Sequence, residues 1–300
     1  MAQTDSDNSF RVVDISPSSD QIHKPQELIQ ITGHDELSLV ARRCITLLWH
    51  NAHNQGVGSG KDYTVELDQL GATKHKGYQI LEDAIESLMK TILTINRADG
   101  TTTRVQFLGG NDMGSPGRAA GVLTYSFDKR LEDILELSSI WGQISLPVLV
   151  ALSNKYSISL YERVAQWAGL NFKNLQEFEL EEFREAMGIE KGKYEKFGAF
   201  NKHVLKPAVR EINALAPFNI AVMPVKRGKQ VTKLKLSWWK KSTEERNEAF
   251  LELQRSRVGR KARIHKNAEM VFAVNASEER QGSQYSLGDS LDSPNPSLLE

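Results

Sequence analysis

Cysteine, long apolar runs and secretion signals are scarce or missing in this sequence. Its 300 residues include one cysteine, Cys44, so no disulfide bond can form within the chain and an intracellular location fits. Cys44 lies on an apolar helical stripe, which predicts a buried, unreactive thiol. No stretch reaches the about 18 uncharged apolar residues of a transmembrane helix. Residues 1–10 lack the basic-then-apolar order of a signal peptide. We therefore expect a cytoplasmic protein.

Motifs of nucleotide and metal chemistry are missing as well. Residues 56–62, GVGSGKD, resemble a phosphate-binding loop. The P-loop spacing, however, needs glycine where Gln55 stands and serine or threonine where Asp62 stands. No paired cysteines have the spacing of metal ligands, and no nucleophile elbow occurs. We therefore expect no cofactor, no bound metal and no catalytic residue.

The charges cancel over the whole chain but not within its segments. The sequence has 38 basic and 38 acidic residues, yet residues 191–241 contain thirteen Lys or Arg against two Glu, a net charge of +11. Residues 1–190 carry −9 and residues 242–300 carry −2. A positive field confined to about 50 residues is typical of a protein that binds a polyanion, above all nucleic acid. The alternative is a solvated basic surface without a partner.

The first half of the chain predicts helices, a short strand and a hairpin. Apolar residues recur at helical spacing in residues 36–52, and residues 62–67 have the composition of a short strand. A short helix is expected around residues 67–71, and a longer one follows with residues from Ile80 to Ile92 on its inner side. The pair Asp99-Gly100 lies between two β-rich runs, which indicates a hairpin turn.

A loop, a strand and a helix complete this half. Residues 109–121 are rich in glycine and are expected to form a loop without regular structure. Residues 121–127 predict a strand, and Asp128 can cap a helix that carries Leu131, Ile134 and Leu135. Together with the preceding elements, this is the order of a winged helix, a helix-turn-helix followed by a β-ribbon.

The same order of elements recurs in the second half. It begins with one or two helices in residues 145–169, and a two-turn helix in residues 181–188 ends at Gly188. A long helix and a hairpin with Arg227-Gly228 at its tip follow, and Ser242 or Thr243 can cap one more helix. We therefore predict an α+β fold of two tandem winged-helix domains. The expected divisions are a flexible tail at 1–26, a first winged helix at 27–138, a second at 139–241, and a helix, basic run and disordered tail at 242–300.

The long helix of residues 194–215 has an apolar and a basic face. Phe197, Phe200, Val204, Ala208, Ile212 and Leu215 fall within an arc of about 120° at the rotation of an α-helix. Lys202, Lys206, Arg210 and Asn213 lie opposite, with His203 beside them. Lysine and asparagine can bond base edges in the major groove, whose width of about 12 Å admits a helix. Pro207 is expected to kink this helix or to start a new segment. A solvated cationic face remains the alternative.

The hairpin after this helix is basic at its tip. Lys226, Arg227 and Lys229 surround the turn, where they can contact the DNA backbone beside the groove. Lys233 and Lys235 alternate with leucines and predict one basic strand face. The first unit differs, because Glu82, Asp83 and Glu86 lie on the outer side of its long helix. There only residues near its start, such as Lys74 and Lys76, suit a phosphate contact.

Three stretches resemble the initiator Rep proteins of iteron-bearing bacterial plasmids. They are SNKYSISLYERVAQW, LEEFREAMGIEKGKYEKFGAFNKHVLKPAVREINAL and VKRGKQVTKLKLSW, and the resemblance covers roughly residues 28–240. It implies two winged-helix domains that bind repeated origin sequences as monomers and open the origin. It also implies homodimers, formed through the first domain, that repress the initiator's own gene, and as partners the host initiator and the replicative helicase. Members often have arginine before Leu-Tyr-Glu, where this chain has Ser159.

The residues expected to bind DNA are chosen from the basic surfaces described above and from the resemblance to initiator Rep proteins. It consists of Lys193, Lys196, Lys202, His203, Lys206, Arg210, Asn213, Lys226, Arg227, Lys229, Lys74 and Lys76. A winged-helix transcription regulator without initiator activity is the alternative function. An origin-nicking enzyme is a third, but its pair of histidines around one bulky apolar residue is missing. Tyr156 and Tyr161 are expected to pack within a helix bundle rather than to act as nucleophiles.

Overall fold

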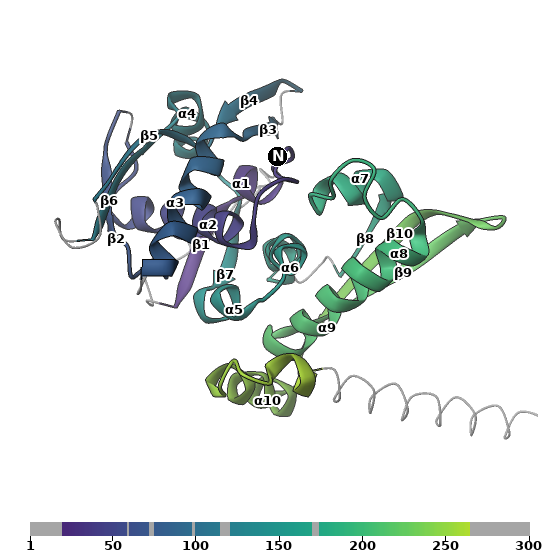
Figure 1. The fold of residues 1–300 in the computed structure, drawn as a ribbon. Coiled ribbons are helices and arrows are strands. Elements are labelled where there is room, and N and C mark those ends of the chain that lie inside the picture. Colours follow the sequence, from purple (N-terminus) through teal and green to yellow (C-terminus); the bar gives the residue numbers. More distant parts are fainter. Residues whose placement is uncertain are drawn as a thin grey trace, which may run out of the picture.

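A computed structural model of the chain describes residues 20–264, except residues 59, 72–74, 98–99, 115–120 and 170–173 and the side chains of residues 75 and 76. The predicted tails at residues 1–19 and 265–300 therefore lie outside the described part. None of the helices described there is long and apolar enough to cross a membrane. Two helix-and-hairpin units lie beside each other, with α6 between them (Figure 1).

The first unit has the predicted order of elements. It consists of α2 (Leu39–Asn54), β2 (Tyr63–Glu66), α3 (His75–Lys90), β3 (Ile92–Asn96), β4 (Thr102–Gln106), β5 (Leu108–Met113), β6 (Val122–Phe127) and α4 (Lys129–Glu136). The strands β3 and β4 form the expected antiparallel hairpin, and β2, β6 and β5 form a separate three-stranded sheet. The carboxylate of Asp128 accepts a hydrogen bond from the backbone N–H of Arg130 and caps α4, as its position predicts.

The second unit repeats this order. It consists of β7 (Trp141–Ser145), α5 (Leu146–Ala151), α6 (Lys155–Ala168), β8 (Leu175–Glu179), α7 (Leu180–Ala186), α8 (Phe197–Phe200), a π-helical turn (Asn201–Leu205), α9 (Lys206–Leu215), β9 (Phe218–Arg227), β10 (Gln230–Lys240) and α10 (Thr243–Gln254). The strands form an antiparallel sheet in the order β8-β10-β9. Ser242 caps α10 in a capping box with Glu245.

The prediction of a flexible tail over residues 1–26 is wrong for the last residues of this range. Residues Gln21–Pro25 form strand β1, which pairs antiparallel with β7, and the short helix α1 (Gln26–Ile29) follows. The ammonium group of Lys24 is buried and lies 2.7 Å from the carboxylate of Glu162 and 2.9 Å from the hydroxyl of Thr46. The pairing and this buried ion pair tie the segment to α2 and α6.

Three other local predictions of the first unit also need correction. Residues 109–113 are part of strand β5 rather than a loop, because their backbone pairs with β6. Residues 67–71 form turns instead of a short helix, with N–H groups bonded to carbonyls three residues before them. Ile80 and Ile92 were placed on an inner helix face, but both are more than 40% exposed. Ile92 belongs to β3, where side chains alternate between two faces.

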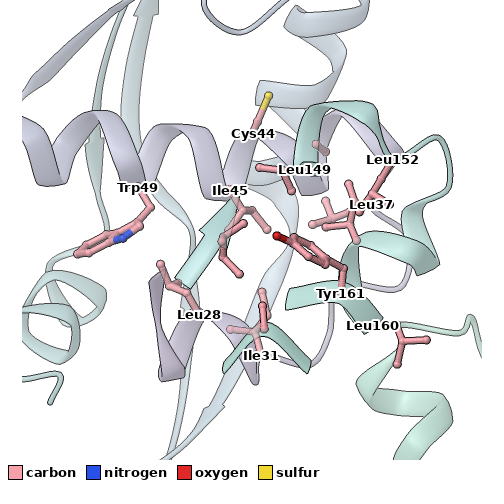
Figure 2. Packing of buried hydrophobic residues seen from close by; sticks show 14 of the residues in the cluster. Leu28, Ile31, Leu37, Cys44, Ile45, Trp49, Leu149, Leu152, Leu160 and Tyr161 are labelled. Atoms are coloured by element: carbon pink, nitrogen blue, oxygen red, sulfur yellow. The ribbon is translucent and has the colours of Figure 1, made fainter. Parts of the chain in front are cut away.

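One apolar cluster extends through both units. Figure 2 shows side chains of α2, among them Cys44 and Trp49, together with Leu149 of α5 and Tyr161 of α6. Cys44 is buried, and desolvation raises the pKa of its thiol to about 12, which keeps it protonated. The predicted burial of this thiol is confirmed. This shared core holds the second unit against the first.

Candidate nucleic-acid interface

The basic helix is continuous but not uniform. It begins at Phe197, passes through the π-helical turn at Asn201–Leu205, and continues as α9 from Lys206. No new segment starts at Pro207; the irregularity near the proline is the π-helical turn that ends two residues before it. We refer to residues 197–215 as the recognition helix. Its apolar side packs into the core, where Phe200, Val204, Ala208, Ile212 and Leu215 are buried.

The opposite side of the recognition helix carries unpaired cations. Lys202, His203 and Lys206 are exposed, and Arg210 is half-buried. Among the described residues, no acidic side chain forms an ion pair with any of them. The imidazole of His203 stacks on Tyr194, with ring centroids 5.7 Å apart and an angle of 21° between the planes. Three cationic or polar side chains thus face outward along about one turn of helix.

Asn213 has a different role from the predicted one. Its side-chain amide donates to the carbonyl of Ile220 at 3.0 Å and accepts from the backbone N–H of the same residue at 2.7 Å. Ile220 belongs to β9, so the amide joins the recognition helix to its own sheet. Both hydrogen-bonding ends are occupied, and Asn213 is no longer a candidate for base reading.

The turn before the recognition helix is held by a buried arginine that the sequence did not single out. Arg184 of α7 donates to the carbonyls of Tyr194 at 2.8 Å and Glu195 at 2.9 Å. Its guanidinium carbon lies 4.6 Å from the ring centroid of Phe200. Tyr194 has a positive φ of 55°, unusual for a residue other than glycine. Arg184 therefore fixes both the turn and the first residues of the helix.

Two lysines of this turn differ in their surroundings. Lys193 is bonded to the carboxylate of Glu190 at 3.0 Å, and this pairing raises the pKa of the lysine. Lys196 is exposed and immediately precedes α8. Lys193 can contact a phosphate only by leaving or sharing its carboxylate, whereas Lys196 has no such competitor among the described residues.

The hairpin β9–β10 forms a wing whose tip and base differ in charge. It runs along the recognition helix and extends beyond α8 (Figure 1). Lys226, Arg227 and Lys229 at the tip are exposed and have no ion-pair partner in the described ranges. Gly228 in the turn has a positive φ of 64°, a conformation that glycine adopts without steric cost.

The base of the wing is neutralised, contrary to the prediction of one basic strand face. Lys233 lies 3.2 Å from the carboxylate of Glu177 and 3.0 Å from that of Glu179, and Lys235 lies 3.8 Å from Glu177. Both acids belong to β8, which pairs with β10 on the side away from β9. The unpaired positive charge of the wing is thus concentrated at its tip.

The first unit presents an acidic outer face, as predicted. Glu82, Asp83 and Glu86 of α3 are exposed. Of the two lysines proposed for phosphate contact there, Lys74 lies outside the described residues, and the side chain of Lys76 does as well. The described part also contains no group of three or more His, Cys, Asp or Glu side chains placed to hold a metal ion.

Comparison with known proteins connects this arrangement to one family. The model described as "Initiator Replication protein, WH1" matches residues 21–165, and the model described as "Initiator Rep protein, WH2" matches residues 179–238. No curated protein matches the chain by sequence.

One solved structure shows the same fold over most of the chain. The crystal structure of the Pi initiator protein in complex with iteron DNA is similar at a TM-score of 0.58 and 19% sequence identity, covering 75% of this chain and 99% of that chain. The WH1 domain of MSBI1.176, a replication protein isolated from a multiple sclerosis patient, aligns with 34% of this chain and 84% of its own at 21% identity and a TM-score of 0.25. The two family models together span most of the described residues, in the order of the two winged-helix domains. The chain belongs to the initiator Rep protein family of plasmid replication initiators.

Proposed function

We propose that the protein binds repeated duplex sequences, iterons, at a plasmid origin and opens the origin with the free energy of binding. The observation that carries this proposal is the unpaired basic surface of the second unit. Lys202, His203 and Lys206 face outward on a helix whose other side is core, and three more cations lie at the wing tip. A helix of this kind fits the major groove, while the wing can neutralise phosphates beside it.

The similarity to the Pi initiator supports duplex DNA as the ligand. That protein was crystallised with iteron DNA, and its fold covers three quarters of this chain. The cations of the recognition helix lie in the segment that the second family model matches. We assign base reading to Lys202, His203 and Lys206 and phosphate contact to Lys196, Arg210, Lys226, Arg227 and Lys229.

The remaining partners follow from the family resemblance. We propose that a dimer forms through the first unit and represses the protein's own gene, whereas a monomer binds the iterons. Recruitment of the host initiator and of the replicative helicase would follow the opening of the origin. The acidic face of α3 suits contact with protein better than contact with DNA, because carboxylates repel phosphate.

We further propose that the protein is not an enzyme. A nicking enzyme needs an accessible tyrosine nucleophile, but Tyr156 is 6% exposed and Tyr161 is 1% exposed. The hydroxyl of Tyr161 accepts a hydrogen bond from the backbone N–H of Ser145, and its ring stacks on Phe218. Burial raises the pKa of the Tyr161 hydroxyl further above its ordinary value, which disfavours the nucleophilic phenolate.

A footprint on the DNA that flanks the protein's own gene tests the initiator function. Tandem protected repeats are expected, and a lone protected palindrome would instead establish the transcription regulator. Binding should weaken steeply as salt rises, because cations that contact phosphates release counterions. The same reactions run on denaturing gels should show no covalent protein–DNA product. Such a product would establish the nicking enzyme.

A further inference from the structure

The two faces of the recognition helix share an unusual spacing. Phe200, Val204, Ala208 and Ile212 follow one another at every fourth residue, and each is 0% exposed. Lys202, Lys206 and Arg210 have the same spacing on the other face. An α-helix turns about 100° per residue, so each step of four residues overshoots a full turn by about 40°. Three such steps would rotate the apolar stripe by about 120° around the helix axis.

The π-helical turn at Asn201–Leu205 reduces this overshoot in the first of the three steps. The backbone N–H of Lys206 donates to the carbonyl of Asn201, five residues earlier instead of four. A turn closed over five residues is wider, and each residue in it rotates less than in an α-helix. The four residues from Phe200 to Val204 therefore rotate by close to one full turn, and the two side chains point in nearly the same direction. The same holds for the basic stripe, because Lys202 lies inside the turn and Lys206 follows it four residues later.

Pro207 explains why the π-helical turn forms at this point of the helix. Proline has no backbone N–H to donate to the carbonyl four residues earlier, and its ring collides with that carbonyl in a regular α-helix. The carbonyl in question belongs to His203, in the middle of the π-helical turn. The widened turn thus lies where a proline at position 207 would strain an α-helix. Turns of this kind are frequent at functional sites.

We propose that Pro207 is a positioning residue for sequence reading. It enforces the π-helical turn, and the turn brings Lys202 into line with Lys206 on the face that enters the DNA groove. Without the proline, the helix closes to α-helical spacing, and the residues before and after position 207 face different parts of the groove. This inference rests on the proposed function in DNA binding, but it concerns the discrimination between sequences rather than binding itself.

The Pro207→Ala variant separates discrimination between sequences from overall DNA affinity. The probes are a duplex enriched by the wild-type protein from a random-sequence pool and a scrambled duplex of equal length and composition. Affinity for the enriched duplex should fall roughly tenfold or more, the loss expected for one good base contact. Affinity for the scrambled duplex should be unchanged, because the number of cations is unchanged. Pro217→Ala, at an exposed proline after the helix, is the matched control and should change neither.

A second substitution tests the alignment directly. Lys202→Ala should weaken binding to the enriched duplex in the wild-type background and have little further effect in the Pro207→Ala background, because Lys202 is already out of line there. Strictly additive losses would overturn the inference, as would undiminished discrimination by Pro207→Ala. If the alanine variant does not fold, Pro207→Ser also restores the N–H and serves in its place. If the wild-type protein has no salt-sensitive affinity for either duplex, the proposed function itself fails.

Discussion

The guanidinium group of Arg42 on α2 donates a hydrogen bond of 2.7 Å to the hydroxyl of Ser159 on α6. The same group is buried and donates to four backbone carbonyls, those of His34 (3.1 Å), Lys155 (3.1 Å), Met187 (3.0 Å) and Gly188 (2.9 Å). Met187 and Gly188 form the turn after α7, so a residue of the first unit supports the helix-turn-helix of the second. Ser159 is buried in this internal contact and is not free to contact a phosphate.

Replacing Arg42 should therefore destabilise the whole molecule. Arg42→Ala is expected to lower the free energy of unfolding by about 3 kcal/mol, because it leaves several buried carbonyls without donors. Arg43→Ala is the matched control, since the neighbouring arginine makes one bond, to the carbonyl of Leu152 at 2.7 Å. Its loss should be about 1 kcal/mol. Urea unfolding followed by circular dichroism measures both, and equal losses would show that the additional bonds of Arg42 contribute nothing.

Arg184 should act on DNA binding without touching DNA. It is buried, and it holds the carbonyls of Tyr194 and Glu195 ahead of the recognition helix. Arg184→Ala is expected to lower affinity for the specific duplex, because the start of the helix loses its support. The slope of log affinity against log salt should stay the same, since no phosphate contact is removed. A reduced slope in titrations at several salt concentrations would place Arg184 in the interface instead.

The two ends of the wing should respond differently to the loss of a cation. Arg227→Ala and Lys229→Ala are each expected to reduce the salt slope by roughly one, the value for a lost phosphate contact. Lys233→Ala is the control on the same hairpin, because its charge is engaged by Glu177 and Glu179. We expect a slope close to that of the wild type. If all three variants change the slope alike, the ion pairs at the base open when DNA binds.

Lys206 should distinguish sequences. It is exposed where the π-helical turn ends, on the side opposite the core. Lys206→Ala is expected to weaken binding to the specific repeat by roughly 1–3 kcal/mol, the range for a base contact, and to affect a random duplex less. Lys240→Ala, at an exposed lysine at the end of β10, provides the control. Equal loss on specific and random duplexes would show that Lys206 contacts only phosphate.

Local signals made much of this fold predictable. Capping by Asp128 and by Ser242 and the stop at Gly188 each depend on a few neighbouring residues, and the structure confirms all three. The order of helices and hairpins follows from such signals. The apolar arc of the recognition helix was likewise visible, because its residues repeat within one element.

Contacts between elements that lie far apart in the sequence could not be predicted from it. Strand β1 pairs with β7, about 120 residues later, and nothing local in residues 21–25 indicates that partner. The neutralisation of Lys233 requires knowledge that β8 lies next to β10 with its glutamates on the same face. Asn213 looked free on a helical wheel, which shows directions around one axis but not the strand beside it. The contacts of Asn213, Lys233 and Lys235 therefore differ from the expected ones, while the role of the basic surface in binding DNA stays a prediction.

One lysine of the basic segment is buried, and it should make stability depend on pH. Lys241 donates to the backbone carbonyl of Asn213 at 2.5 Å, and desolvation lowers its pKa to about 8, although Glu245 and Glu248 act in the opposite direction. In the unfolded chain a lysine keeps its proton up to about pH 10.4. Between these values the unfolded state binds more protons, so the stability of the wild type should rise with pH.

The Lys241→Met variant isolates this contribution from the other groups that titrate in the same range. The free energy of unfolding of the wild type, relative to the variant, should increase from pH 8 to pH 10 by no more than about 2 kcal/mol, after allowance for solvent screening. Well below pH 8 the difference should be constant, since Lys241 is then protonated in both states. Denaturant unfolding at each pH measures it. A difference that falls as the pH rises would contradict this prediction. It would mean that the folded protein favours the ammonium form of Lys241, because Glu245 and Glu248 outweigh the desolvation.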